Sequence, residues 1–388
     1  MMSLDLTRII LKNRYNMIKI GITGQAGFVG THLYTTLGLF PEEFERIEFH
    51  KDYFEEDIKL NDFVVQCDVI IHLAAMNRHN DPQVIYETNI GLVKKLIQSL
   101  EQTNSKPHIL FSSSTQEERD NLYGKSKKEG RELMVHWAKN SGGKFTGMII
   151  PNVFGPFGHP NYNSVIATFC HQLSHDETPK IEVDGDMKLI YVGELIQVLL
   201  SEIRSGVGKS EMIVHPTSES KVSSILDLLE SYKIQYQDNG IIPTIDTAFE
   251  LNLFNTYRCY MDVANYFPVK YTKHTDPRGS FVEVIRLGIG GQVSFSTTVP
   301  GITRGNHYHT RKIERFSVIK GKALIQLRRI GTEDVFNFYL DGDEPAYVDM
   351  PIWFTHNIKN IGDDILYTNF WINEFYDPND PDTYFEEV

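Results

Sequence analysis

Two histidines and a glutamate stand close together in the stretch GNHYHTRKIERFSVIKG, residues 305–321. The side chains of His307, His309 and Glu314 are good ligands for a transition metal. Alternate residues of a strand point to the same side, so an extended chain here turns both histidines one way. Glu314 can return on the next strand. We therefore predict a metal site that contains these three residues.

Imidazole and carboxylate ligands suit zinc, iron, manganese, nickel or cobalt, and residue types alone do not choose among these metals. We expect a divalent metal and favour zinc. A single buried histidine is most often structural, whereas several at a regular spacing with a glutamate favour a metal. The pattern leaves open whether the metal is catalytic or structural.

A second reactive pair lies in the first half, where Tyr123 and Lys127 are four residues apart in a helical pattern. This spacing places them on one face of a helix. A nearby ammonium favours the phenolate and lowers the pKa of a tyrosine, so the pair can pass a proton to a carbonyl oxygen as hydride reaches the carbon. A Tyr-x-x-x-Lys pattern arises about once by chance in a chain with 19 tyrosines. Its position after a strand that ends in serines, the last of them Ser114, supports the interpretation.

The elements before this pair predict a dinucleotide-binding fold. The apolar run 18–23 is typical of a buried parallel strand, and a turn with Gly24, Gly27 and Gly30 leads from it into a helical pattern. These glycines allow backbone amides to approach a pyrophosphate, whose charge the helix N-terminus then faces. Further apolar runs at 68–75 and 108–114, with a helical pattern between them, predict a doubly wound parallel sheet.

The second strand is expected at 46–49, and His50 and Lys51 follow it, with Asp52 next. NAD enzymes usually carry an acidic residue at this point for the ribose 2′-hydroxyl. Cations there suit a 2′-phosphate, so NADPH is favoured over NADH. The alternative is that both are solvated surface residues.

These motifs resemble the extended short-chain dehydrogenase/reductase family, together with His72–Ala75 and Pro151–Pro156, over about residues 17 to 250. The resemblance implies a nucleotide-linked sugar as substrate. It also implies that Tyr123 is the general acid, that Ser114 orients the carbonyl, and that Lys127 also holds the nicotinamide ribose. Asn89 matches a supporting position after the fourth strand. Ile150 replaces a common arginine, so a substrate or sheet contact is expected to differ.

By the same resemblance, the cofactor contacts fall on the glycine turn, the strand ends and the tyrosine helix: Gly24, Gly27, Phe28, Val29, Gly30, His50, Lys51, Leu73, Ala74, Asn89, Tyr123, Lys127, Pro151 and Val153. Asn152 is expected to contact the substrate.

From residue 292 onward, short β-branched and aromatic runs alternate with turn residues, which predicts an all-β sandwich or barrel. The spacing of its glycines, histidines and glutamate between 301 and 321 resembles the first cupin motif. Pro351, His356 and Asn360 resemble the second, in which Trp353 here replaces the usual glycine. This resemblance implies that His356 is the fourth metal ligand, beside His307, His309 and Glu314. We predict an extension of unknown role at 1–16, an NADP-binding domain with its substrate-binding part at 17–262, and a cupin at 263–388.

The stretch DPRGSFVE at 276–283 resembles the corresponding part of nucleotide-sugar 3,5-epimerases, which are also cupins. This resemblance implies that Arg278 contacts a substrate diphosphate, and a structural salt bridge is the equal alternative. The base of those epimerases aligns with His307, which here is expected to bind metal. His307, Tyr308 and Lys312 therefore remain unranked candidates for a base.

Composition excludes several classes of function. The net charge is −13 and the chain has no long basic run, so nucleic acid is not an expected partner. The sequence has no run of eighteen apolar residues, so we expect no membrane span. The three cysteines are far apart, which fits a reducing cytoplasm rather than a disulfide framework. A homodimer is expected by analogy with both fold types.

The combination of both parts, with the closing sequence NEFYDPNDPDTYFEEV, resembles bifunctional capsular polysaccharide enzymes of the CapF type. The resemblance implies that the cupin epimerises carbon 3 of a UDP-2-acetamido-2,6-dideoxy-4-hexulose. The reductase domain then uses NADPH to reduce carbon 4, which gives UDP-2-acetamido-2,6-dideoxy-L-talose on the route to UDP-N-acetyl-L-fucosamine. Two alternatives are a plain 4-ketoreductase with a structural or ligand-sensing cupin, and a non-catalytic sensor of nucleotide sugar or NADP(H).

Overall fold

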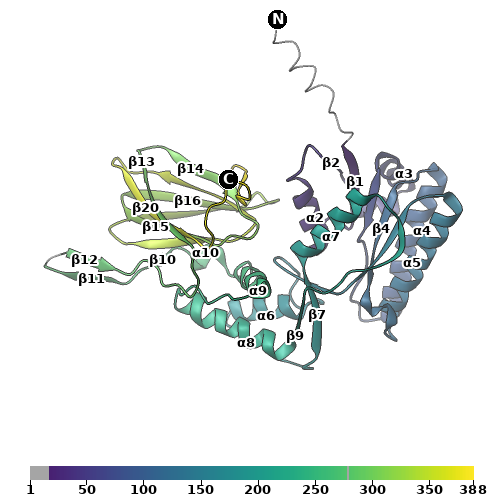
Figure 1. Ribbon diagram of the computed structural model, residues 1–388, viewed down its shortest axis with the longest axis horizontal. Helices are drawn as coiled ribbons and strands as arrows, with labels where there is room; N and C mark the ends of the chain where they lie inside the picture. The colour runs from purple at the N-terminus through teal and green to yellow at the C-terminus, as the bar shows by residue number, and fades with distance from the viewer. Residues whose placement is uncertain (1–16, 278) are drawn as a thin grey trace, which may run out of the picture. The chain divides into compact units, whose positions relative to one another are not determined.

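The computed structural model describes residues 17–277 and 279–388 (Figure 1). The predicted extension at 1–16 and the predicted diphosphate contact Arg278 lie outside the described residues. The chain forms two compact units, of which the first comprises the residues up to Val153 and Lys188–Glu219. The second comprises Phe154–Met187 and Ser220–Val388. The boundary expected between 262 and 263 rests on a change in composition and stays a prediction.

The first unit contains a six-stranded parallel sheet in the order β2-β1-β3-β4-β5-β8. Its strands are β1 (Ile18–Thr23), β2 (Phe44–Ile47), β3 (Val69–His72), β4 (His108–Ser114), β5 (Phe145–Ile150) and β8 (Lys209–Ile213). Its helices are α2 (Phe28–Leu37), η1 (Lys51–Glu55), α3 (Asp57–Gln66), α4 (Pro82–Thr103), η2 (Thr115–Glu118), α5 (Leu122–Ser141) and α7 (Val192–Ser205). The second strand begins at Phe44, two residues before the predicted start at 46, and ends at Ile47, two residues before the predicted end at 49.

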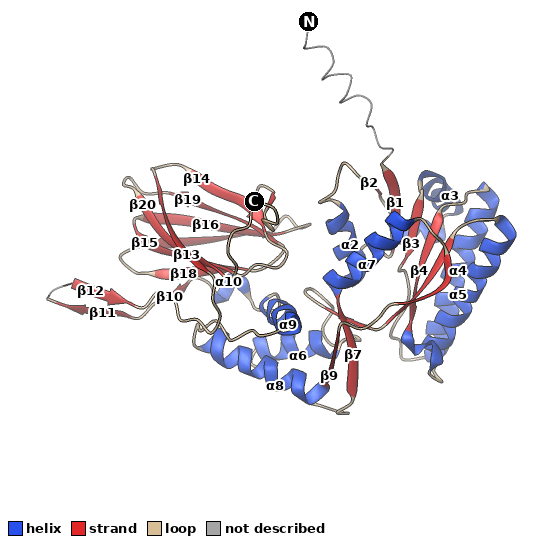
Figure 2. Cartoon of the chain, viewed as in Figure 1, coloured by secondary structure: helices blue, strands red, loops and turns tan. Residues whose placement is uncertain are grey.

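Helices cover both faces of this sheet, with α2 and α7 on one side and α3, α4 and α5 on the other (Figure 2). Successive residues of a strand point to opposite faces, which is why each buried strand is a continuous apolar run. On β4, Leu110 packs with α2 and α7, whereas Ile109 and Phe111 pack with the opposite layer. The predicted doubly wound fold is confirmed.

The second unit combines helices with two antiparallel five-stranded sheets. The helices are α6 (Val165–Ser174), α8 (Val222–Tyr232), the π-helical η3 (Lys233–Asp238), α9 (Ala248–Arg258) and α10 (Val263–Tyr266). One sheet has the order β10 (Val269–Lys270), β18 (Ala346–Met350), β15 (Glu314–Lys320), β20 (Leu366–Ile372) and β13 (Gln292–Thr298). The other has the order β17 (Val335–Asp341), β16 (Lys322–Arg329), β19 (Phe354–Asn360), β14 (Thr303–Tyr308) and β21 (Tyr384–Phe385).

Two smaller sheets complete the described fold. Strands β11 (Lys273–Asp276) and β12 (Gly279–Val282) form an antiparallel hairpin. Strands β6 (Asn152–Phe154), β7 (Asp186–Tyr191) and β9 (Ser218–Lys221) form a three-stranded sheet.

The two five-stranded sheets share one apolar core, to which Val318 of β15, Leu327 of β16 and Val348 of β18 contribute with no exposed surface. The alternation of buried and exposed residues along β16 is typical of a strand with one face on a core. The predicted all-β fold of this part is confirmed.

A buried polar group joins the helical segment of the second unit to its sheets. The Arg315 guanidinium donates two hydrogen bonds to Asp349, at 2.7 and 2.9 Å, and the Tyr236 hydroxyl donates another at 2.6 Å. All three side chains are at most 2% exposed. Because every charge here has a partner, this buried group stabilises the contact between the helical segment and the sheets that carry the predicted metal ligands.

Of the helices in the described ranges, none combines the length and hydropathy needed to cross a lipid bilayer.

Candidate active site and candidate metal centre

The glycine turn packs against the end of β3. Gly24 has a φ of +78°, and a Cβ at this position would lie 2.8 Å from the Ala74 amide nitrogen. At Gly30 a Cβ would lie 2.2 Å from the Gly24 carbonyl oxygen, so the turn can approach the helix only with glycine. The Leu73 amide donates to the Thr23 carbonyl at 3.1 Å. The structure thus brings the glycines of the turn, which are predicted to contact the cofactor, close to Leu73 and Ala74, which carry the same prediction.

Helix α2 begins at Phe28 with its first amide groups uncapped by a side chain. Its N-cap is Gly27, and its first turn contains no acidic residue. The four leading amides of a helix have no partner inside it, and the helix dipole adds partial positive charge there. This end of α2 has the character of a phosphate-binding terminus.

Opposite charges lie beyond the end of β2. His50 and Lys51 are exposed, and the His50 Nε2 lies 3.1 Å from a carboxylate oxygen of Glu48. The Phe49 amide donates to the Gln25 side chain at 3.3 Å, which ties this strand end to the glycine turn. Because the predicted strand ran to Phe49, Glu48 was missed as a residue beyond its end. The preference for a 2′-phosphate stays a prediction.

Ser114 and Tyr123 are positioned by η2, which separates them in the chain. The Ser114 hydroxyl accepts a hydrogen bond from the Gln116 amide at 3.2 Å and so caps η2. Asn121 caps α5 by accepting from the Gly124 amide at 2.7 Å. A Cβ on Gly124 would lie 2.0 Å from the Gln116 carbonyl oxygen. This close packing sets the first turn of α5, with Tyr123, against the turn that begins at Ser114.

Lys127 lies one helical turn after Tyr123. Its ammonium donates to the Ser112 carbonyl at 2.8 Å and lies 5.8 Å from the centroid of the Tyr123 ring. Burial lowers the pKa of Lys127 to about 8, against the opposing charge of Glu117. The predicted pairing on one helical face is present, and the lysine charge is held close to the phenol.

Glu117 was not found by sequence reasoning. It is 6% exposed and accepts three hydrogen bonds from Arg131 of α5, at 2.7, 2.9 and 3.3 Å, and one from the Ser113 hydroxyl. It therefore connects the end of β4 to the helix that carries Tyr123. No periodic or motif signal links residues that meet only through a turn and a helix.

Asn89 lies in α4, between β3 and β4, so its predicted place after the fourth strand was wrong. Its side chain accepts from the Met76 amide at 2.7 Å and donates to the Ser126 hydroxyl at 3.0 Å. The Ser126 hydroxyl donates in turn to the Tyr123 carbonyl at 2.7 Å. Asn89 thus supports the Tyr123 turn through Ser126.

The segment after β5 supplies the remaining predicted residues. Pro151 is buried and Val153 packs against the core beside α2 and α7. Asn152 is exposed, and its side chain donates to the Lys188 carbonyl at 3.3 Å. Ile150, which replaces the arginine of the resembled family, pairs in register with Ser114 and is 7% exposed. An apolar side chain therefore lies beside the serine strand end.

The four predicted metal ligands converge in the second unit. His307 lies on β14, His309 directly follows it, Glu314 begins β15 and His356 lies on β19. One ligand atom from each lies within 4.8 Å of all the others. Nε2 of His309 and Nε2 of His356 each lie 3.2 Å from the same oxygen of Glu314. This donor set fits one divalent cation.

The electrostatics of this cluster favour ligands that are ready to bind metal. Burial, and then the neighbouring His356, lower the pKa of His307 to about 4, so this ring is neutral at pH 7. Burial opposes the charge of Glu314, yet His309 and His356 hold the pKa of its carboxyl well below the usual range. Nε2 of His356 is buried and makes no hydrogen bond, although it lies close to Glu314. A divalent cation held by these residues would give this unsatisfied buried nitrogen a partner.

Tyr308 and Lys312, two of the candidate bases, are engaged elsewhere. The Tyr308 ring stacks with Trp353 and packs against Tyr384, at centroid distances of 5.7 and 5.4 Å. The Lys312 ammonium is buried and donates to the Pro381 carbonyl at 2.6 Å. The identity of a base among the three candidates stays open.

Trp353, which replaces the usual glycine of the second cupin motif, keeps a left-handed conformation with φ +62°. Its amide donates to the His309 carbonyl at 2.8 Å. A bulky residue in this region is strained, so stacking and this hydrogen bond must hold it there.

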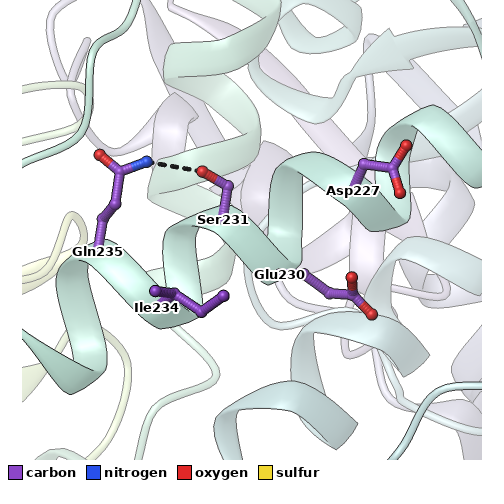
Figure 3. Close-up of a pocket in the computed structure, with 5 residues that line it drawn as sticks. All are labelled: Asp227, Glu230, Ser231, Ile234 and Gln235. Atoms are coloured by element: carbon purple, nitrogen blue, oxygen red, sulfur yellow. Dashed lines mark hydrogen bonds between the residues drawn. The ribbon is translucent and has the colours of Figure 1, made fainter.

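A pocket of about 330 Å³ lies elsewhere in the second unit, along α8 and η3 (Figure 3). It is lined by Asp227, Glu230, Ser231, Ile234 and Gln235. Figure 3 shows the Gln235 side chain turned toward Ser231, to which it donates at 2.7 Å. None of the predicted site residues lines this pocket.

Residues 20–212 match the NAD dependent epimerase/dehydratase family, and residues 274–384 match the polysaccharide biosynthesis C-terminal domain. The first match identifies a nicotinamide dinucleotide as the class of cofactor. RMD from Pseudomonas aeruginosa, solved with NADPH, is 21% identical, with a TM-score of 0.51 over 56% of this chain and 83% of that chain. This likeness shows a shared fold alone.

Two relatives span nearly the whole chain. The UDP-2-acetamido-2,6-beta-L-arabino-hexul-4-ose reductase of Pseudomonas aeruginosa is 30% identical over 95% of this chain and 98% of its own length. The capsular polysaccharide assembling protein CapF from Staphylococcus aureus is 35% identical and covers 95% of this chain and 100% of that chain, with a TM-score of 0.62. The chain therefore belongs to the CapF-type family of capsular polysaccharide proteins, in which an NAD dependent epimerase/dehydratase domain precedes a polysaccharide biosynthesis C-terminal domain.

Proposed function

We propose that this chain is a bifunctional nucleotide-sugar enzyme. Its C-terminal domain, in which the four predicted ligands would hold a metal, epimerises carbon 3 of a UDP-2-acetamido-2,6-dideoxy-4-hexulose, and its Tyr123 site then reduces the carbon-4 ketone with NADPH. The product is UDP-2-acetamido-2,6-dideoxy-L-talose, on the route to UDP-N-acetyl-L-fucosamine for surface polysaccharide. The observation that carries the proposal is one chain with both a supported Tyr123–Lys127 pair and a four-ligand cluster whose His356 Nε2 lacks a hydrogen bond. The name of the Pseudomonas aeruginosa reductase supports the choice of substrate.

The reductase step uses residues of the first unit. Bound NADPH supplies the hydride. The Tyr123 phenol donates a proton to the carbonyl oxygen at carbon 4, Ser114 orients that oxygen, and the Lys127 charge stabilises the phenolate that remains. His72, whose pKa burial lowers to about 3, is neutral and adds no positive charge that would repel Lys127.

Epimerisation must come before reduction. The hydrogen on carbon 3 is acidic only while carbon 4 is a ketone, because the carbanion delocalises into an enolate. Bound metal supplies the Lewis acidity that polarises such a carbonyl. His307, His309, Glu314 and His356 would hold the cation. Reduction at carbon 4 removes the activating ketone and fixes the new configuration.

The experiment that tests both activities is NMR of the 4-keto UDP-sugar with the full-length protein in heavy water, before and after NADPH is added. We expect deuterium to enter at carbon 3 without NADPH, and the ketone to be consumed once NADPH is present. Absence of exchange with intact reduction would favour a plain 4-ketoreductase. Absence of both reactions would favour a non-catalytic sensor.

A further inference from the structure

The C-terminal segment, residues 373–388, contacts His307 and His309 and the residue next to His356, the three predicted histidine ligands. Phe385 of β21 pairs in register with His307 of β14. The Asp382 carbonyl accepts a hydrogen bond from Nδ1 of His309 at 2.5 Å. Beside His356, the Thr355 hydroxyl donates to the Glu386 carbonyl. No predicted site residue lies in this segment, although its sequence is part of the family resemblance.

Asp382 of this segment binds the turn between His309 and Glu314. It is 1% exposed, and its carboxylate accepts hydrogen bonds from the three successive amides of Thr310, Arg311 and Lys312 at 3.0, 3.0 and 3.1 Å. The Thr310 hydroxyl donates a fourth at 2.6 Å. These donors satisfy the buried charge and fix the turn between His309 and Glu314, two of the proposed ligands.

The backbone of the same residue determines which nitrogen of His309 faces the cluster. A carbonyl oxygen can only accept a hydrogen bond, so Nδ1 of His309 carries the proton in its contact with Asp382. Nε2 is then the atom that faces Glu314, at 3.2 Å. Asp382 has a φ of +39°, and this left-handed backbone lets the residue direct its carboxylate at the turn and its carbonyl at the ring.

We propose that Asp382 is a positioning residue of the metal centre: its carboxylate holds the turn between two ligands, and its carbonyl holds His309 in the tautomer that binds metal. Groups of this kind orient a ligand and raise its basicity, and their loss typically weakens metal binding by about 10–100-fold. The inference rests on the proposed metal site and not on epimerisation.

The decisive variant is Asp382→Asn, compared with Asp377→Asn as a matched control in the full-length protein. Asparagine keeps the main-chain carbonyl that contacts His309. In the side chain it replaces one carboxylate oxygen, a hydrogen-bond acceptor, with an NH₂ group that faces N–H donors. Asp377 is exposed in the same segment, and its carboxylate accepts only from Asn379 among the described contacts. Zinc competition against a chromophoric chelator should show about 10–100-fold weaker binding for Asp382→Asn and wild-type binding for Asp377→Asn.

A second readout separates positioning from general stability. Correlation of the imidazole nitrogens and protons by NMR should show a protonated Nδ1 of His309 in zinc-loaded wild-type protein, and a shifted or exchange-broadened signal in Asp382→Asn. If Asp382→Asn fails to fold, Thr310→Val removes only the 2.6 Å hydrogen bond and should weaken zinc binding in the same direction, by a smaller factor. Wild-type zinc affinity in the folded variants would overturn the inference. Absence of zinc binding by the wild-type protein would instead overturn the metal site itself.

Discussion

At the scale of single residues, side chains of mixed character lie where the sequence predicts contact with a 2′-phosphate of the cofactor. His50, Lys51 and Glu48 all lie beyond β2, and Glu48 already contacts His50. A 2′-phosphate is favoured by cations and disfavoured by a carboxylate, so changing one charge should move the balance. We expect Lys51→Glu to shift the ratio of kcat/KM for NADPH and NADH toward NADH by about tenfold, the effect of a change of ~1.4 kcal/mol in binding. An unchanged ratio would show that Lys51 does not contact the cofactor.

The pH dependence of reduction should follow the charge of Lys127. Burial lowers its pKa to about 8, so the ammonium is lost as pH rises through that value. Because the proposed reduction uses this charge beside Tyr123, we expect kcat to be highest below pH 8 and to fall above it. Glu117 opposes the burial effect, so Glu117→Gln should move the descending limb to lower pH.

The control for this prediction is Glu117→Asp, which keeps the anion and should leave the limb closer to that of the wild-type protein. The measurement is kcat for ketone reduction across pH at saturating NADPH and sugar. A limb that stays in place in Glu117→Gln would mean that Glu117 does not influence the Lys127 charge.

At the scale of elements, the sequence located the strands well where an apolar run was bounded by turn residues. β4 has the predicted bounds, and the glycine turn and the α5 pair lie where the pattern placed them. β2 was misplaced because Phe49 is apolar and buried, although it follows the strand. Glu117 and Asp382 could not be predicted, since hydrogen bonds between distant segments leave no periodic signal.

The contact between η2 and α5 can be tested with a single methyl group. A Cβ at Gly124 would lie 2.0 Å from the Gln116 carbonyl, a backbone atom, so Gly124→Ala must displace the turn that positions Tyr123. We expect a destabilisation of about 1–3 kcal/mol, from thermal unfolding, and a lower kcat for reduction.

Gly91→Ala is the matched control, because Gly91 lies inside α4 and a Cβ there meets nothing within 4 Å. This change should stabilise the protein by about 0.5–1 kcal/mol and leave the kinetics unchanged. Wild-type stability and activity in Gly124→Ala would show that η2 can shift without moving the phenol.

At the scale of the whole molecule, the two candidate sites lie in separate compact units, each with its own apolar core. Damage at one site should therefore leave the other chemistry intact. Tyr123→Phe should slow ketone reduction by roughly 10²–10⁴-fold, because a general acid is lost, while carbon-3 exchange continues. His309→Ala should bind less metal and lose exchange, while it still reduces a ketone that has already been epimerised.

Mixing these two variants tests whether one chain must perform both steps. Nothing in the chemistry requires the 4-keto intermediate to stay on one protein, since epimerisation leaves the ketone for reduction elsewhere. We expect a mixture of Tyr123→Phe and His309→Ala to form the reduced 3-epimer much faster than either variant does alone, as followed by NMR of the sugar protons. The rate should rise with the concentration of either variant, because the intermediate must diffuse between proteins. An inactive mixture of two folded variants, each with its remaining partial activity, would mean that the ketone passes between sites without release.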